Sequence, residues 1–203
     1  MFNMTEKSLL NKQAYNQMAG AYLQDRSRLR SHRYVTKFEE LLPRQASILD
    51  LGCGAGVPVD DYLIKKGHLV TGLDISETQI NMAKQRCKGG AFWVKNLMDL
   101  QQEEYQVDAV ISLYTIFHLP RKIHLDFLKK IVSFLPTGGK LLISMGDDNF
   151  EAEHDLYGQK VWSSHYDART SLEMVKNAGF EILLSEIDQS GQEKHLFILA
   201  EKI

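Results

Sequence analysis

A glycine cluster that directly follows a short apolar run constrains this chain more than any other feature. Residues 47–51, SILDL, predict a buried strand, and the segment 52–56, GCGAG, comes immediately after it. Glycine lets a backbone turn sharply and lets a ligand approach the chain closely. Pro58 fits the first turn of a following helix, and Gly67 fits the C-terminal cap of that helix. The N–H groups at the start of the helix would point at the loop, which suits an anionic group.

Short apolar runs alternate with helical patterns along the rest of the chain. We expect strands at residues 47–51, 68–73, 91–95, 107–114, 140–145, 180–187 and 195–200. We expect helices in the first forty residues, including 27–42, and at 58–67, 76–88, 122–135 and 170–177. The last two strands form a hairpin around residues 189–192. This alternation predicts an α/β fold, a Rossmann-like three-layer sandwich around a seven-stranded, mostly parallel sheet with one antiparallel strand from the C-terminal hairpin.

Composition limits the classes of protein to consider. The 203 residues suit one domain, with 24 basic and 26 acidic side chains. A protein built mainly to hold nucleic acid would normally have a clear basic excess. Two cysteines are too few for a disulfide framework or a thiolate zinc site. The longest apolar run is 196–200, far short of a membrane span, and residues 1–17 have no signal-peptide core, so we expect a cytoplasmic protein.

An acidic residue after the second expected strand points to a nucleoside ligand. Asp74 lies 22 residues beyond Gly52, where a carboxylate can accept hydrogen bonds from both hydroxyls of a ribose. A dinucleotide site would need a third glycine at the position of Val57. A pyrophosphate is also disfavoured beside Asp50, whereas a ligand amino group would be stabilised there.

At these residues the chain resembles class I S-adenosylmethionine-dependent methyltransferases, of the small-molecule type related to quinone-biosynthesis enzymes. The resemblance covers about residues 45–200. The matching segments are ILDLGCGAG at 48–56, GLDIS at 72–76, FWVKNLMDL at 92–100, VDAVISLYTIFHLP at 107–120 and LPTGGKLLIS at 135–144. It implies S-adenosylmethionine as the cofactor.

The resemblance assigns roles around the glycine loop. Gly52 and Gly54 would lie under the methionine part of the cofactor, and Asp50 would face its ammonium group. Asp74 would hold the ribose, and Ile75 would pack on the adenine. The structural alternatives are turn residues for the glycines, a helix-capping acid for Asp74 and plain core packing for Ile75.

Further cofactor contacts are implied elsewhere in the chain. Asn96 stands where the family usually has Asp near the adenine amino group, and Leu97 would offer its backbone N–H. Ser112 would line the sulfonium, and Tyr15 and Tyr22 would touch the ligand from the N-terminal segment. The alternatives are a turn residue at Asn96, a buried small residue at Ser112 and core packing for the other three.

Two segments are candidate covers for the site. The first is the helical segment 1–44, which precedes a cofactor-binding core at 45–203 within one domain. The second is residues 146–167, expected to be a long lid loop with six acidic side chains. Its end, WSSHYD at 162–167, would line the acceptor pocket together with His118.

The catalytic candidates are His118, His165 and Tyr166, with His118 as the base if the acceptor must lose a proton. His118 has a structural alternative as a cap of a short helix. His154 and His165 lie near carboxylates, but no compact ligand spacing predicts a metal site.

The sequence therefore predicts methyl transfer from S-adenosylmethionine to a small molecule, because no motif for DNA-base or cytosine C5 methylation is present. The alternatives are an RNA methyltransferase using the basic run at 26–37, an NAD-linked oxidoreductase and a non-catalytic binder of the cofactor. Nucleic acid and membrane partners are not expected. The acceptor's identity and the oligomeric state, monomer or homodimer, stay open.

Overall fold

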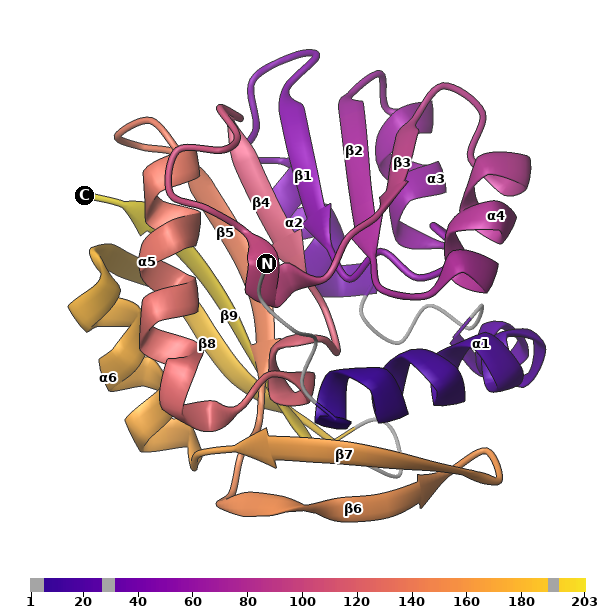
Figure 1. Cartoon of the computed structure of the whole chain (residues 1–203). Helices are drawn as coiled ribbons and strands as arrows, with labels where there is room; N and C mark the ends of the chain where they lie inside the picture. Colours follow the sequence, from indigo (N-terminus) through magenta and orange to yellow (C-terminus); the bar gives the residue numbers. More distant parts are fainter. Residues whose placement is uncertain (1–5, 27–31, 190–193) are drawn as a thin grey trace.

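A computed structural model describes residues 6–26, 32–189 and 194–203, and within them a larger sheet, a separate hairpin and flanking helices (Figure 1). The strands are β1 (Ser47–Leu51), β2 (Leu69–Asp74), β3 (Ala91–Val94), β4 (Ala109–Ser112), β5 (Lys140–Met145), β6 (Phe150–Leu156), β7 (Gln159–His165), β8 (Phe180–Asp188) and β9 (His195–Lys202). The α-helices are α1 (Glu6–Arg26), α2 (His32–Glu39), α3 (Val59–Lys65), α4 (Glu77–Arg86), α5 (His124–Phe134) and α6 (Ala168–Ala178). Short 3₁₀ helices are η1 (Leu97–Asp99), η2 (Ile116–His118) and η3 (Arg121–Ile123).

The larger sheet has seven strands in the order β3-β2-β1-β4-β5-β9-β8. β9 runs antiparallel to both of its neighbours, and the other six strands run parallel to one another. The order reverses between β1 and β4, which is where an open α/β sheet leaves a crevice at the carboxyl ends of its strands. The predicted seven-stranded, mostly parallel sheet with one antiparallel strand is confirmed.

Helices cover both faces of this sheet and enclose two apolar cores (Figure 1). On one face α5 buries Phe127, Leu128 and Ile131, the apolar positions whose spacing predicted that helix. On the other face Phe38 of α2 and Leu63 of α3 are fully buried. Each such side chain stabilises the fold by about 1.5–3 kcal/mol. These two cores, one on each face of the sheet, confirm the predicted three-layer arrangement.

Two expected elements are shorter in the structure than in the prediction. The strand expected at 107–114 is limited to Ala109–Ser112, and shortly after its end Tyr114 adopts a left-handed backbone conformation with φ of 58°. The helix expected at 27–42 is observed as His32–Glu39, and residues 27–31 lie outside the described residues.

The expected loop at 146–167 is instead mostly a β-hairpin, so this prediction was wrong about its structure. Glu151, Glu153 and Asp155 alternate along β6 and are exposed, a period-two pattern that indicates a half-exposed strand. Tyr157 and Gly158 link the strands with φ of 48° and 76°, as a type I′ turn requires.

Helix α1 crosses the carboxyl-end side of the sheet and lies beside the hairpin (Figure 1). Ala14 and Met18 of α1 pack with Val161 of β7 in a small apolar cluster. At the other edge Asn16 Oδ1 accepts hydrogen bonds from Ser76 Oγ at 2.6 Å and from the Thr78 N–H at 3.2 Å. The helix therefore joins the glycine-loop half of the molecule to the hairpin.

Two glycine-to-alanine changes should shift stability in opposite directions. A Cβ at Gly72 would lie 2.6 Å from Phe92 Cδ1 and 2.8 Å from Cys53 Sγ, so Gly72→Ala should lower the free energy of unfolding by about 1–3 kcal/mol. Gly20 lies inside α1 with nothing within 4 Å of an added Cβ, so Gly20→Ala should raise it by about 0.5–1 kcal/mol. Urea unfolding monitored by circular dichroism measures both, and equal effects would contradict the packing argument.

Candidate active site

The carboxylate of Asp74 holds the glycine loop in place. Its Oδ2 accepts the Gly54 N–H at 3.0 Å, and its Oδ1 accepts the Ser76 N–H at 2.8 Å. The Gly52 N–H donates to the Leu73 carbonyl at 2.7 Å. One side chain thus fixes both the loop after β1 and the start of α4. Each of its oxygens keeps a further lone pair for a ligand.

Gly52 is required by a close approach as well as by its backbone conformation. Its φ is 90°, and a Cβ there would lie 2.0 Å from Thr115 Oγ1. Any larger residue would therefore push the loop away from the end of β4.

Two adjoining cavities lie along this loop. The first cavity holds about 660 Å³ of empty space, which includes solvent at its mouth. Of the predicted site residues, it is lined by Tyr15, Tyr22, Gly52, Gly54, Asp74, Ile75, Asn96, Leu97 and His118. The second, here called the loop cavity, is lined by the segment 52–59 with Asp50 and Tyr22. The structure therefore brings together all but one of the predicted cofactor residues.

Asn96 has a structural role in addition to its place in the wall. Its side-chain oxygen accepts the Met98 N–H at 3.1 Å and so caps η1. The two explanations that the sequence left open for Asn96 are compatible with each other.

Buried acids make this region electrostatically unusual. Burial, together with repulsion from the nearby Asp74 carboxylate, raises the pKa of Asp50 to about 7. Burial, with repulsion from Asp50, raises the pKa of the fully buried Asp60 well above its usual range. Burial raises the pKa of Asp74 to about 6, although N–H donors lower it. Because no lysine or arginine is among the described residues lining the two cavities, a cationic ligand would stabilise the ionised acids.

Tyr15 of α1 and His118 of η2 form a hydrogen-bonded pair in the wall of the first cavity. Tyr15 Oη lies 2.8 Å from His118 Nε2, and His118 Nδ1 lies 3.1 Å from the Trp162 carbonyl oxygen. A carbonyl only accepts, so Nδ1 carries the proton and neutral Nε2 accepts from the tyrosine. Asn11 fixes the same stretch of β7, accepting the Trp162 N–H at 2.8 Å and donating to the Trp162 carbonyl at 3.0 Å.

A third cavity, here called the outer cavity, adjoins the first on the side of the hairpin. Four residues line both: Tyr15, Tyr22, Tyr114 and His118. The remaining wall includes Phe117, Asp147, Asp148, Phe150, His154, Ser163, His165, Lys194 and His195. His165 Nδ1 donates to the Asp148 carbonyl at 2.7 Å, and its ring stacks on Phe150 with centroids 5.5 Å apart. Of the predicted acceptor segment 162–167, only Ser163 and His165 line this cavity.

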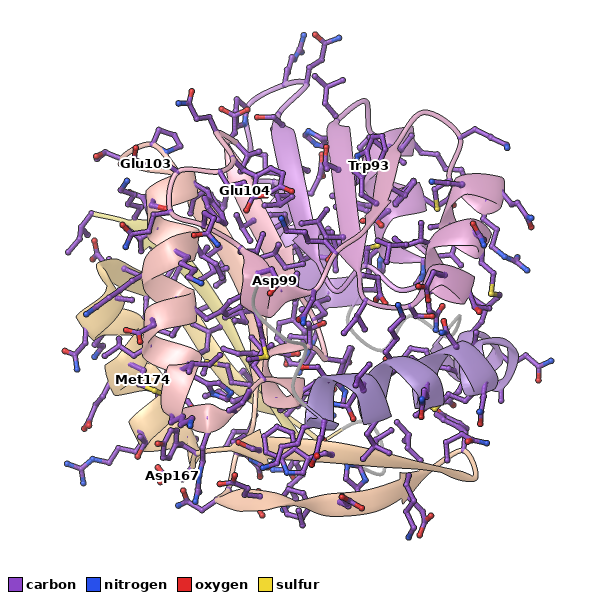
Figure 2. All side chains as sticks on the ribbon, viewed as in Figure 1. Trp93, Asp99, Glu103, Glu104, Asp167 and Met174 are labelled. Atoms are coloured by element: carbon purple, nitrogen blue, oxygen red, sulfur yellow. The ribbon has the colours of Figure 1, made fainter. Side chains whose placement is uncertain are left out.

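Two predicted site residues lie elsewhere. The hydroxyl of the fully buried Ser112 donates to the Leu51 carbonyl at 2.8 Å, which ties β4 to β1 instead of lining the cavities. The ring of Tyr166 packs under Arg121, 5.2 Å from the guanidinium carbon, and beside His124. Tyr166 lies outside the cavity because β7 ends at His165 and the chain then turns into α6. Asp167, labelled in Figure 2, caps that helix and accepts the Thr170 N–H at 2.9 Å.

Sequence reasoning missed several residues that belong to these walls, among them Asn11, Tyr114 and Gln79. Asn11 and Tyr114 line the first cavity, and Gln79 lines both the first and the loop cavities. Tyr114 follows the fourth strand at its carboxyl end, a position that was a usable signal. Asn11 gave none, because its role depends on the hairpin that α1 meets.

The one arginine of the basic run whose side chain is described has its acidic partners outside the acidic segment. In the basic run, Arg28 and Arg30 lie outside the described residues, and Arg33 pairs with Glu186 at 2.7 Å and Asp188 at 3.3 Å. In the acidic segment, Glu151 pairs with Arg121 at 3.0 Å. Among the residues that the structure describes, no three His, Cys, Asp or Glu side chains are placed to hold a metal ion.

Comparison with known proteins agrees with this geometry. A family model described as a methyltransferase domain matches residues 48–139. The chain is 28% identical over 109 residues to ubiquinone biosynthesis O-methyltransferase from Coxiella burnetii, covering 52% of this chain and 45% of that protein. It is 31% identical over 147 residues to phosphoethanolamine N-methyltransferase 1 from Zea mays, covering 68% of this chain and 29% of that protein.

Residues 48–139 are matched as a methyltransferase domain, and the chain has the fold of S-adenosylmethionine-dependent methyltransferases. It spans less than half the length of these curated methyltransferases. The crystal structure of magnesium protoporphyrin IX methyltransferase from Synechocystis PCC 6803 with bound S-adenosylmethionine has the same fold, with a TM-score of 0.75 at 17% identity over 100% of both chains. The predicted superfamily is therefore confirmed. In the described part of this chain, no helix combines the length and the apolar character that crossing a membrane requires.

Removing the buried charge of Asp50 should stabilise the protein most at alkaline pH. A carboxyl whose pKa is raised to about 7 by folding favours the folded state below its unfolded pKa near 4, and this contribution is lost as pH rises through 7. Asp50→Asn should therefore raise the free energy of unfolding by about 1 kcal/mol or more at pH 8, with a smaller gain at pH 5. Urea unfolding at both pH values measures this, with the exposed Asp155→Asn as the matched control. An identical pH slope for wild type and Asp50→Asn would contradict the buried-charge argument.

Proposed function

We propose that this protein transfers a methyl group from S-adenosylmethionine to a small-molecule acceptor. The observation that carries the proposal is the meeting of the first and outer cavities at Tyr15, Tyr22, Tyr114 and His118. Methyl transfer needs donor and acceptor held side by side in line, and positioning supplies much of the rate. The names of the relatives, which refer to ubiquinone biosynthesis and to phosphoethanolamine, support an acceptor of small size.

The residues present fit the cofactor. Asp74 offers acceptor oxygens to ribose hydroxyls, and Asp50 lies along the neighbouring loop cavity as a partner for an ammonium group. Ile75 and Leu97 give apolar surface to a base. When bound, S-adenosylmethionine supplies a methyl group on a positively charged sulfur. The walls of the first and loop cavities are acidic and have no lysine or arginine among their described residues, which favours that cation over the pyrophosphate of a dinucleotide.

The same arrangement gives His118 a role as proton acceptor. Its Nδ1–H donates to a backbone carbonyl, so its Nε2 lone pair is directed at the Tyr15 hydroxyl. An acceptor hydroxyl in the outer cavity that displaces or contacts Tyr15 would pass its proton toward Nε2 as the methyl group is transferred. His165, held by the Asp148 carbonyl, is placed in the wall to orient the acceptor. Tyr166 takes no part in this proposal.

Cofactor binding should depend on Asp74 and on pH. S-adenosylhomocysteine should raise the melting temperature of the wild type, and NADH should not. Asp74→Ala should weaken S-adenosylhomocysteine binding by about tenfold or more, because it also leaves the Gly54 and Ser76 N–H groups without their acceptor.

The affinity for S-adenosylhomocysteine, measured by calorimetry, should increase from pH 6 to pH 8. Asp50 and Asp74, with pKa values of about 7 and about 6, must ionise to pair with the ligand. Stabilisation by NADH alone would overturn the proposed cofactor.

Turnover should depend on His118 more strongly than cofactor affinity does. The protein is incubated with methyl-labelled S-adenosylmethionine and a metabolite extract, and mass spectrometry identifies the molecule that gains a methyl group. With that acceptor, His118→Ala should lower kcat by about 10²-fold or more while leaving the cofactor Kd within a few-fold, and Tyr15→Phe should have a smaller effect. Full turnover by His118→Ala would remove the base, and label appearing in RNA instead of a metabolite would overturn the acceptor class.

A further inference from the structure

Gln79 is a buried polar side chain whose capping role is only half fulfilled. It lies in the first turn of α4 with 1% of its surface exposed. The Ser76 side chain accepts the Gln79 N–H at 3.1 Å, which is the first of the two hydrogen bonds of a capping box. In a complete capping box the Gln79 amide would also bond to the Ser76 N–H. The structure lacks that second bond.

The reason is that Asp74 already occupies the donor. The Ser76 N–H donates to Asp74 Oδ1 at 2.8 Å. Within the described residues, both Gln79 Nε2 and Gln79 Oε1 are buried and have no hydrogen-bond partner. Leaving such groups unpaired costs free energy, and native proteins rarely do so without a ligand or water to complete them.

The position of Gln79 shows where its partner would come from. Gln79 lines the first cavity beside Asp74 and the loop cavity beside Gly54. A Cβ built on Gly54 would lie 3.9 Å from Gln79 Oε1. The unpaired amide is therefore placed where the two cavities join, next to the carboxylate proposed to hold the ribose.

We infer that the Gln79 amide completes the ribose site, which deepens the proposed function and rests on it. A carboxylate can only accept, so a ribose hydroxyl that donates to Asp74 still has lone pairs that need a donor. Gln79 Nε2 supplies that donor, and Gln79 Oε1 accepts from the neighbouring hydroxyl. An acid and an amide together thus satisfy a diol that neither satisfies alone.

The test replaces Gln79 with an apolar residue of similar size. Without ligand, Gln79→Met should melt at a higher temperature than wild type because it removes two unpaired buried atoms. In calorimetry it should bind S-adenosylhomocysteine about tenfold more weakly. A stability gain combined with an affinity loss is the signature of a ligand-directed group, since a merely structural residue would lose both. The matched control is Gln85→Met, an exposed glutamine on the same helix, which should change neither.

Analogues of S-adenosylhomocysteine that lack one ribose hydroxyl, 2′-deoxy or 3′-deoxy, identify the bond. Wild type should lose about tenfold in affinity for at least one of them, and Gln79→Met should lose little more for that analogue. Gln79→Leu repeats the comparison if Gln79→Met does not fold. Wild-type affinity for S-adenosylhomocysteine in the Gln79 variant overturns this inference and leaves the proposed function intact. Absence of binding by the wild type overturns the proposed function, and this inference with it.

Discussion

The arrangement of the site depends on one carboxylate that accepts two backbone N–H groups. Asp74 receives the Gly54 N–H on one oxygen and the Ser76 N–H on the other, so the glycine loop and the start of α4 share a single anchor. Backbone donors to a carboxylate are strong and directional, and they set the loop without any side chain of its own. The same bonds leave the Gln79 amide without its capping partner. Because Asp74 takes the Ser76 N–H that a complete capping box would give to Gln79, the Gln79 amide stays unpaired in the wall of a cavity.

Helix α1 imposes the second constraint, because it completes walls that the sheet alone leaves open. Its Asn16 accepts a hydrogen bond from Ser76 at the start of α4, and its Asn11 bonds both the N–H and the carbonyl of Trp162. Its Tyr15 forms a hydrogen bond with His118. These contacts join residues 60 to 151 positions apart in the chain. The shared boundary of the first and outer cavities therefore exists only when α1 and the hairpin are both in place.

The sheet and the cofactor side were predictable from sequence, whereas the acceptor side was less so. Runs such as 47–51 and 140–145 are buried on both faces, so their apolar character alone marks them as strands. The glycine loop and Asp74 could be recognised locally, because each stands at the carboxyl end of a strand that its own sequence predicts. The hairpin was missed because its alternating acids were counted as loop charge and not as one face of a strand. Ser112 and Tyr166 do not line the cavities as expected. The direction of the Ser112 side chain at the end of β4 and the exact end of β7 before Tyr166 both depend on tertiary packing. The half-used capping box at Gln79 shows the same limit, since competition for the Ser76 N–H is invisible in sequence.

The bond from His118 to Trp162 has an evolutionary consequence. The group that selects the tautomer of His118 is a main-chain carbonyl, and every residue type carries one. Substitutions along the hairpin can therefore reshape the chamber next to His118 while the imidazole keeps its orientation. His165 lines that chamber from the same strand that supplies the carbonyl, whereas Ser163 also contacts His118 Nδ1, with its Oγ 3.5 Å away. Under the proposed function, a lineage of such proteins could exchange one acceptor for another through hairpin side chains alone, with the orientation of His118 inherited unchanged.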